Sequence, residues 1–174
     1  MTAVALIATA TALGACTQSV PVTTPSPLAS SSGATSRAPD VFDVAGSARH
    51  LVCRGAGAPI VVLLAGARDD TSTWDGLVAR MGPAVRTCAF DYPGVGASDP
   101  SPAPITADLV ASSLHSTFAV ARVAPPYVLV GHSLAGLSVR AFVGRYPDEV
   151  AGVVLFDPTP VEYACARSAS NSNG

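Results

Sequence analysis

Charge is scarce in this sequence, and its basic residues form no cluster. Lys and Arg number 10 and Asp and Glu 12 among 174 residues, so charged side chains make up only 13% of the chain. Proteins that bind nucleic acid present basic patches, so this composition argues against a nucleic-acid partner. Because 49% of the residues are hydrophobic, it also argues against a disordered chain and favours one ordinary domain with attachments.

Metal ligands and histidines are scarce too. No His/Cys cluster has ligand spacing, so the sequence indicates neither a metal nor an organic cofactor. The three histidines are His50, His115 and His132. Their small number matters for any mechanism that needs an imidazole base.

The apolar run at the start, MTAVALIATATALGA, is too short to span a bilayer but suits the hydrophobic part of a signal peptide. It leads into Leu13-Gly14-Ala15-Cys16, which resembles the bacterial lipobox, although no Lys or Arg precedes the run. We therefore expect residues 1–16 to be a signal peptide, with Cys16 as the lipidation site. The protein would be an extracytoplasmic lipoprotein held at the membrane by its lipid anchor. The alternative is an ordinary secretory leader.

Residues 17–40 are mostly Ser, Thr, Pro and Ala, a composition typical of an extended, solvated linker. Residues 41–160 contain the apolar segments of a folded domain, and residues 161–174 form a polar tail. Outside the cytoplasm, cysteines within a folded domain are more often bridged than free.

Within the domain, short apolar runs alternate with helical patterns. We expect a hairpin over 41–53 with its turn at Gly46 and Ser47, a capping box at Ser72 and Asp75, and a helix stop at Gly82. The expected strands cover residues 59–64, 85–90, 127–130 and 150–156, and the later helices cover 106–121 and 134–145.

The helix expected over 106–121 has a broad apolar face. Its members are Ile105, Leu109, Val110, Leu114 and Phe118. Most of the strands are apolar throughout, which is typical of parallel strands with both faces covered. We therefore predict an α/β fold, a mostly parallel sheet with helices on both of its faces.

A serine stands between one of these strands and the helix that follows, in Gly131-His132-Ser133-Leu134-Ala135. Over residues 41–160 the chain here resembles the α/β-hydrolase family, whose pattern is G-x-S-x-G in this context. Alanine replaces the last glycine, and it is small enough for a strained turn. The resemblance implies that Ser133 is the catalytic nucleophile of a serine hydrolase.

Two further segments carry the resemblance. Leu64-Ala65-Gly66-Ala67 follows the strand where the family places its oxyanion loop, so the backbone N–H groups of Ala67 and Leu134 would hold the developing oxyanion. The stretch DYPGVGASDP resembles the family's glycine-rich turn, which we interpret as structural. The family's strand order would also place Cys53 opposite Cys88, within range of a disulfide; the alternative is two buried thiols.

None of the three histidines is a credible base for Ser133. His132 is adjacent in sequence and should point away, His50 is on the hairpin, and His115 lies about 13 Å along its helix from the catalytic edge. In the family the histidine follows the last strand. Asp157 is a candidate acid by position, although an Asp-Pro turn is the simpler interpretation.

We therefore expect the N-terminal part of an α/β-hydrolase fold, truncated after the strand that follows the nucleophile helix and inactive alone. If completed, it would hydrolyse small ester-type substrates. The alternative is a non-catalytic surface lipoprotein that retains the half-fold as an interaction module. The substrate cannot be read from the sequence.

Overall fold

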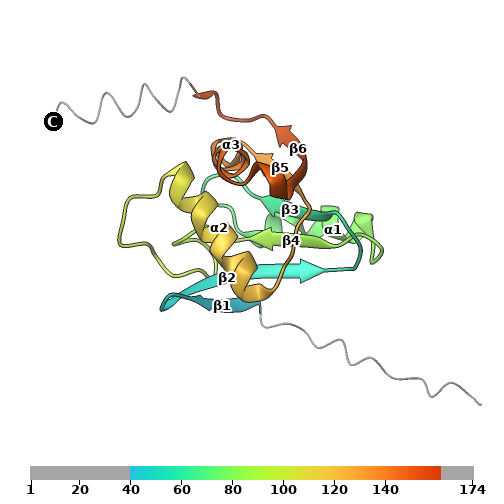
Figure 1. Ribbon diagram of the computed structural model, residues 1–174, viewed down its shortest axis with the longest axis horizontal. Coiled ribbons are helices and arrows are strands. Elements are labelled where there is room, and N and C mark those ends of the chain that lie inside the picture. The colour runs from blue at the N-terminus through green and yellow to red at the C-terminus, as the bar shows by residue number, and fades with distance from the viewer. Residues whose placement is uncertain (1–39, 162–174) are drawn as a thin grey trace, which may run out of the picture. The chain divides into compact units, whose positions relative to one another are not determined.

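A six-stranded sheet forms the centre of the fold in the computed structural model, which describes residues 40–161 (Figure 1). The sheet order is β1-β2-β4-β3-β5-β6. The strands are β1 Val41–Val44, β2 Ser47–Arg54, β3 Ile60–Leu64, β4 Thr87–Phe90, β5 Tyr127–His132 and β6 Val150–Phe156. The first two pairings, β1 with β2 and β2 with β4, are antiparallel, and the others are parallel. The expected α/β class with a mostly parallel sheet is confirmed.

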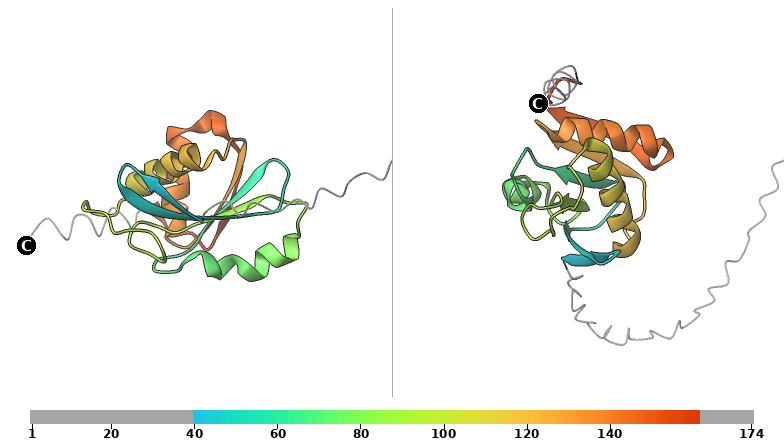
Figure 2. Two further views of the ribbon diagram at one scale, coloured as in Figure 1. Left: turned by 90° about the horizontal axis from the view of Figure 1, so that it is seen from below. Right: turned by 90° about the vertical axis from the view of Figure 1, so that its left-hand side faces the viewer.

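Helices lie on both sides of this sheet (Figure 2). They are α1 Asp75–Met81, α2 Ala107–Ala121 and α3 Ala135–Arg145, with short 3-10 turns η1 Thr71–Trp74 and η2 Pro147–Glu149. Helices α2 and α3 cover one face and bury the larger apolar cluster, which includes Leu114, Phe118 and Phe142. Helix α1 lies on the other face, where Trp74 packs in a smaller cluster with Leu63 and Val130.

The expected leader, Cys16, the linker up to residue 39 and the tail beyond Val161 lie outside the described residues. Within residues 40–161, no helix is long and apolar enough to cross a membrane.

Local turn chemistry differs from the sequence-based prediction at two places. The hairpin turns at Ala45 and Gly46, both with positive φ, instead of at Gly46 and Ser47, because Ser47 already belongs to β2. The capping box at Ser72 and Asp75 is wrong. The carboxylate of Asp70 accepts hydrogen bonds from both the hydroxyl and the N–H of Ser72, which starts η1 first. Those two bonds also hold the pKa of Asp70 below its ordinary value.

Helix α2 begins where Thr106 accepts a hydrogen bond from the N–H of Leu109 at 3.1 Å. Val110, Leu114 and Phe118 are buried as expected. Ile105 is not a core residue. It precedes the N-cap, so it does not share the buried helix face, and its side chain is 52% exposed.

Strand β6 is the outermost strand of the sheet formed by residues 40–161. Its side chains include exposed apolar groups, namely Val153, Val154 and Phe156, which are 44%, 42% and 49% exposed. An apolar strand of this kind is typical of the interior of a parallel sheet.

Cys53 and Cys88 are directly opposed on β2 and β4 and are joined by a disulfide, with their Cα atoms 4.1 Å apart. The bond ties the antiparallel hairpin to the parallel part of the sheet. It closes a loop with a sequence separation of 35.

Removing this bond by a Cys53→Ala/Cys88→Ala double substitution should lower the free energy of unfolding by about 3–4 kcal/mol, because the unfolded chain regains its loop entropy. Denaturant unfolding with and without a reductant measures the effect. The reductant should shift the wild-type transition and leave that of the double variant unchanged. Peptide mapping without reductant that finds both thiols free would contradict the pairing.

Candidate active site

Ser133 occupies the bend between β5 and α3 with a left-handed backbone, φ +52°. This conformation costs a non-glycine residue about 1–2 kcal/mol, so the neighbouring structure must hold it in place. Its N–H donates to the carbonyl of Phe156, and its carbonyl accepts from the N–H groups of Gly136 and Thr159, each at 3.0 Å. The bend is therefore tied to the end of β6 and to the segment that follows it.

Small residues around the bend let β5 and α3 approach each other. A Cβ on Gly131 would stand 2.9 Å from Cγ2 of Val139, and one on Gly136 would stand 2.7 Å from Cβ of Pro158. Ala135, which replaces the family's glycine, is fully buried in the larger apolar cluster. Its methyl group is accommodated there, so the departure from the pattern leaves the bend intact.

Two backbone N–H groups are the oxyanion donors that the sequence predicts. Leu134 follows Ser133 directly, and Ala67 belongs to the loop after β3, the strand that pairs with β5. Within residues 40–161, neither N–H group donates a hydrogen bond, and the Ser133 hydroxyl has no partner. Unpaired N–H groups are the donors that an oxyanion requires.

Tyr92 fixes the start of that loop. Its hydroxyl donates to the carbonyl of Ala65 at 2.9 Å, and both residues are buried. Burial raises the pKa of the Tyr92 phenol, and the nearby Ser138 hydroxyl only partly opposes this shift. The phenol therefore keeps the proton that it donates. Sequence reasoning missed this contact because it joins segments 27 residues apart.

Asp91 connects three segments through one buried carboxylate, whose side chain is 1% exposed. One oxygen accepts from the N–H of Thr71 at 2.7 Å, and the other accepts from His50 Nδ1 at 2.7 Å and from the N–H of Ala97 at 3.1 Å. A Cβ on Gly96 would overlap the second oxygen, and Gly96 has φ +54°. The glycine-rich turn thus closes around Asp91.

Two of the three histidines, His50 and His115, lie far from Ser133. His50 is on β2, three strands from β5 in the sheet order, or about 14 Å. His115 pairs with Glu149 at 3.0 Å and stacks on Tyr146. Glu149 directly precedes β6, whereas Ser133 bonds to Phe156, the last residue of that strand. The length of β6 therefore separates Glu149 from Ser133 by about 20 Å.

His132 ends β5, and its ring lies against the oxyanion loop. A Cβ on Gly66 would stand 3.1 Å from Nδ1 of His132. No hydrogen bond joins this ring to Ser133. Asp157 is exposed in the turn after β6 with φ +42°, and within the described ranges its carboxylate bonds to no histidine.

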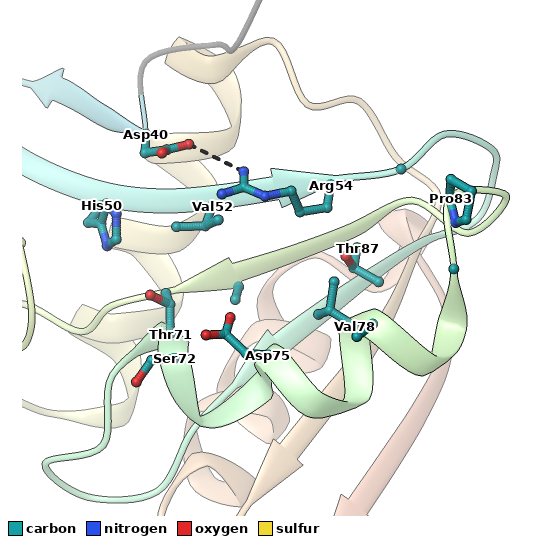
Figure 3. Close-up of a pocket in the computed structure, with 14 residues that line it drawn as sticks. Asp40, His50, Val52, Arg54, Thr71, Ser72, Asp75, Val78, Pro83 and Thr87 are labelled. Atoms are coloured by element: carbon teal, nitrogen blue, oxygen red, sulfur yellow. Dashed lines mark ion pairs between the residues drawn. The ribbon is translucent and has the colours of Figure 1, made fainter. Parts of the chain in front are cut away.

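Two cavities differ in their relation to the serine. A cavity of about 120 Å³ is lined by Leu134, Leu137, Ser138, Tyr92 and the start of α2. A larger one of about 750 Å³ lies between β2, β4 and α1, and Figure 3 shows His50, Thr71 and Asp75 around it. The larger cavity touches neither Ser133 nor Leu134. In the part of the chain that the structure describes, no group of three or more His, Cys, Asp or Glu could hold a metal ion.

Replacing Tyr92 by Phe should lower the free energy of unfolding by about 1–3 kcal/mol, because the buried Ala65 carbonyl loses its donor. Amide hydrogen exchange at Asp69, whose N–H donates to the Gly66 carbonyl at 3.2 Å, should become faster. Tyr127→Phe is the matched control, because that hydroxyl donates to the Val123 carbonyl at 2.7 Å. It should lower stability without a selective change at the oxyanion loop. Unchanged exchange in the Tyr92 variant would refute the positioning role.

Replacing Gly96 by Ala should lower the free energy of unfolding by roughly 2–4 kcal/mol, since the methyl group displaces a buried carboxylate and the backbone is left-handed. Gly144→Ala, in α3 with open space at its Cβ, should instead raise that free energy by about 0.5–1 kcal/mol. Chemical denaturation of both variants gives the comparison. Equal effects would contradict the close packing around Asp91.

Comparison with known proteins agrees with the fold. Residues 61–171 match the sequence profile of the family described as "Alpha/beta hydrolase family". The uncharacterized protein YqjL of Bacillus subtilis is 30% identical over 118 residues, which are 67% of this chain and 47% of YqjL.

Among solved structures, Cfl2 of Burkholderia cenocepacia is 28% identical with a TM-score of 0.63, covering 67% of this chain and 40% of Cfl2. E-2-(acetamidomethylene)succinate hydrolase is 26% identical with a TM-score of 0.63, covering 70% of this chain and 44% of that protein. The chain thus spans less than half the length of each of these proteins. The chain belongs to the α/β-hydrolase family.

Proposed function

We propose that this chain supplies the nucleophile and the oxyanion hole of a serine hydrolase that acts on ester-type substrates. The observation that carries this proposal is the left-handed bend at Ser133, together with the N–H groups of Leu134 and Ala67, which are unpaired in residues 40–161. The Ser133 hydroxyl attacks the acyl carbon, and the N–H groups of Ala67 and Leu134 stabilise the negative charge on the carbonyl oxygen. Family membership and the similar hydrolase of solved structure support it.

The proton of Ser133 must be taken by a base that none of the three histidines provides. His50, His115 and His132 each lie elsewhere, as their contacts with Asp91, Glu149 and the oxyanion loop indicate. Losing the histidine of a serine triad typically lowers kcat by about 10⁶. We therefore propose that this polypeptide, taken alone, is nearly inactive.

We also propose that the protein works outside the cytoplasm as a lipoprotein anchored through Cys16. The lipobox-like Leu13-Gly14-Ala15-Cys16 supports this location. The disulfide between Cys53 and Cys88 is consistent with it, since such bonds persist mainly in oxidising compartments.

A second candidate function is an interaction module that keeps the half-fold without catalysis. The exposure of Val153, Val154 and Phe156 on β6 favours it, because exposed apolar patches often mark sites of protein association. A stable protein with a cooperative unfolding transition and no reactive serine would favour this alternative.

A p-nitrophenyl ester assay on the purified chain tests the catalytic proposal. Hydrolysis should not exceed that of a Ser133→Ala control, because none of the three histidines is in place to take the proton of the hydroxyl. Clear turnover that depends on Ser133 would show that a base is present after all.

Added imidazole gives the complementary measurement. If only the base is missing, free imidazole should speed ester hydrolysis more in the wild-type chain than in Ser133→Ala, which corrects for the direct reaction of imidazole with the ester. Equal acceleration in both proteins would contradict the role of Ser133 as a nucleophile.

A further inference from the structure

The small cavity beside Leu134 is surrounded by apolar side chains, some of which are exposed to solvent. Its volume is about 120 Å³, and its apolar lining includes Val110 and Leu137. Two of the exposed large hydrophobic residues of the described chain also line it, Ile105 at 52% and Leu134 at 43%. Exposed apolar side chains gathered around a hollow are typical of a binding site.

The cavity is continuous with the nucleophile bend. Leu134, one of its lining residues, directly follows Ser133 and carries one of the two oxyanion N–H groups. Leu137 and Ser138 come from the first turns of α3, and Tyr92 comes from the segment that holds the oxyanion loop. An acyl group attached at Ser133 therefore has an apolar hollow next to it.

The chemistry of the lining restricts what can bind. None of the residues that line the cavity is charged. The Tyr92 hydroxyl already donates to the Ala65 carbonyl, and Ser138 is buried at 6% exposure. A charged acyl group would lose its favourable hydration in this cavity without gaining a hydrogen-bond or ion-pair partner. A hydrocarbon chain has no such hydration to lose.

The volume restricts the length. A cavity of about 150 Å³ lined by aliphatic side chains holds one benzene molecule, so a cavity of 120 Å³ is filled by slightly fewer than six carbons. We propose that this cavity is the acyl-chain site of the enzyme and that it holds about the first four or five carbons of an uncharged acyl group. This inference rests on the proposed function of Ser133 for the position of the acyl carbon.

Binding of unreactive acyl analogues tests this site without any need for catalysis. Propionamide, butyramide, hexanamide and octanamide can be titrated into the full chain while the methyl groups of Ile105, Val110, Leu134 and Leu137 are followed by NMR. Dissociation constants on the order of 1–10 mM are expected for such small ligands. Affinity should rise about fourfold per added methylene up to four or five carbons and then level off.

Two variants of α2 localise the binding. Ala107→Phe fills the cavity from the start of the helix and should weaken butyramide binding at least tenfold. Ala119→Phe places the same side chain at an exposed position near the other end of α2 and should leave binding unchanged. Circular dichroism and thermal unfolding confirm that both variants are folded. If Ala107→Phe does not fold, Leu137→Trp replaces it as the filling substitution.

Several outcomes would overturn the inference. The first is the absence of methyl shifts when butyramide is added. The second is an equal loss of binding in Ala107→Phe and Ala119→Phe. The third is an affinity that continues to rise fourfold per methylene up to octanamide. Ser133→Ala should still bind butyramide, since binding requires no nucleophile. The acyl-chain site can therefore fail while the reactivity of Ser133 stands, and the reactivity of Ser133 can fail while the cavity still binds.

Discussion

The left-handed backbone of Ser133 depends on the parallel pairing of β5 with β6. In that register His132 lies beside Phe156, so the chain leaves both strands at the same edge. The Ser133 N–H reaches the Phe156 carbonyl, and the Thr159 N–H returns to the Ser133 carbonyl. Without these bonds Ser133 would relax toward an ordinary backbone conformation, which would remove about 1–2 kcal/mol of unfavourable conformational energy. The conformation of Ser133 thus depends on the apolar strand β6 as well as on the helix α3 that follows the bend.

The oxyanion loop depends in the same way on two consecutive residues after β4. Asp91 accepts the N–H of Thr71 at the far end of the loop, and Tyr92 donates to the carbonyl of Ala65 at its beginning. Both side chains are buried, so neither bond competes with water. One short segment therefore sets both ends of the loop that carries Ala67. The disulfide between β2 and β4 ties the strand before this segment to the hairpin.

Sequence patterns predicted the helices and most of the strands, but they failed at two local turns and at contacts between distant segments. The apolar runs of β3 and β5 and the periodicity of α2 gave these elements within about two residues, because burial on both faces or on one stripe leaves a clear pattern. Ile105 fits that stripe in sequence, yet it lies before the N-cap and faces a cavity. The bonds of Tyr92 and Thr159 leave no local signal, since their partners are set only by the packed loops.

The histidines show how completely the fold uses its polar groups. His50 donates to a carboxylate that is 1% exposed, and turning the ring away would leave that buried oxygen with one donor fewer, at about 1–3 kcal/mol. His115 would have to leave both Glu149 and the stacked ring of Tyr146. The ring of His132 borders the loop after β3, where a Cβ on Gly66 would stand 3.1 Å from its Nδ1. Recruiting any of these rings as the base would therefore disturb the sheet or the loops that hold Ser133 and Ala67. A base from outside residues 40–161 would leave these contacts intact, which fits the reactivity that we propose for Ser133.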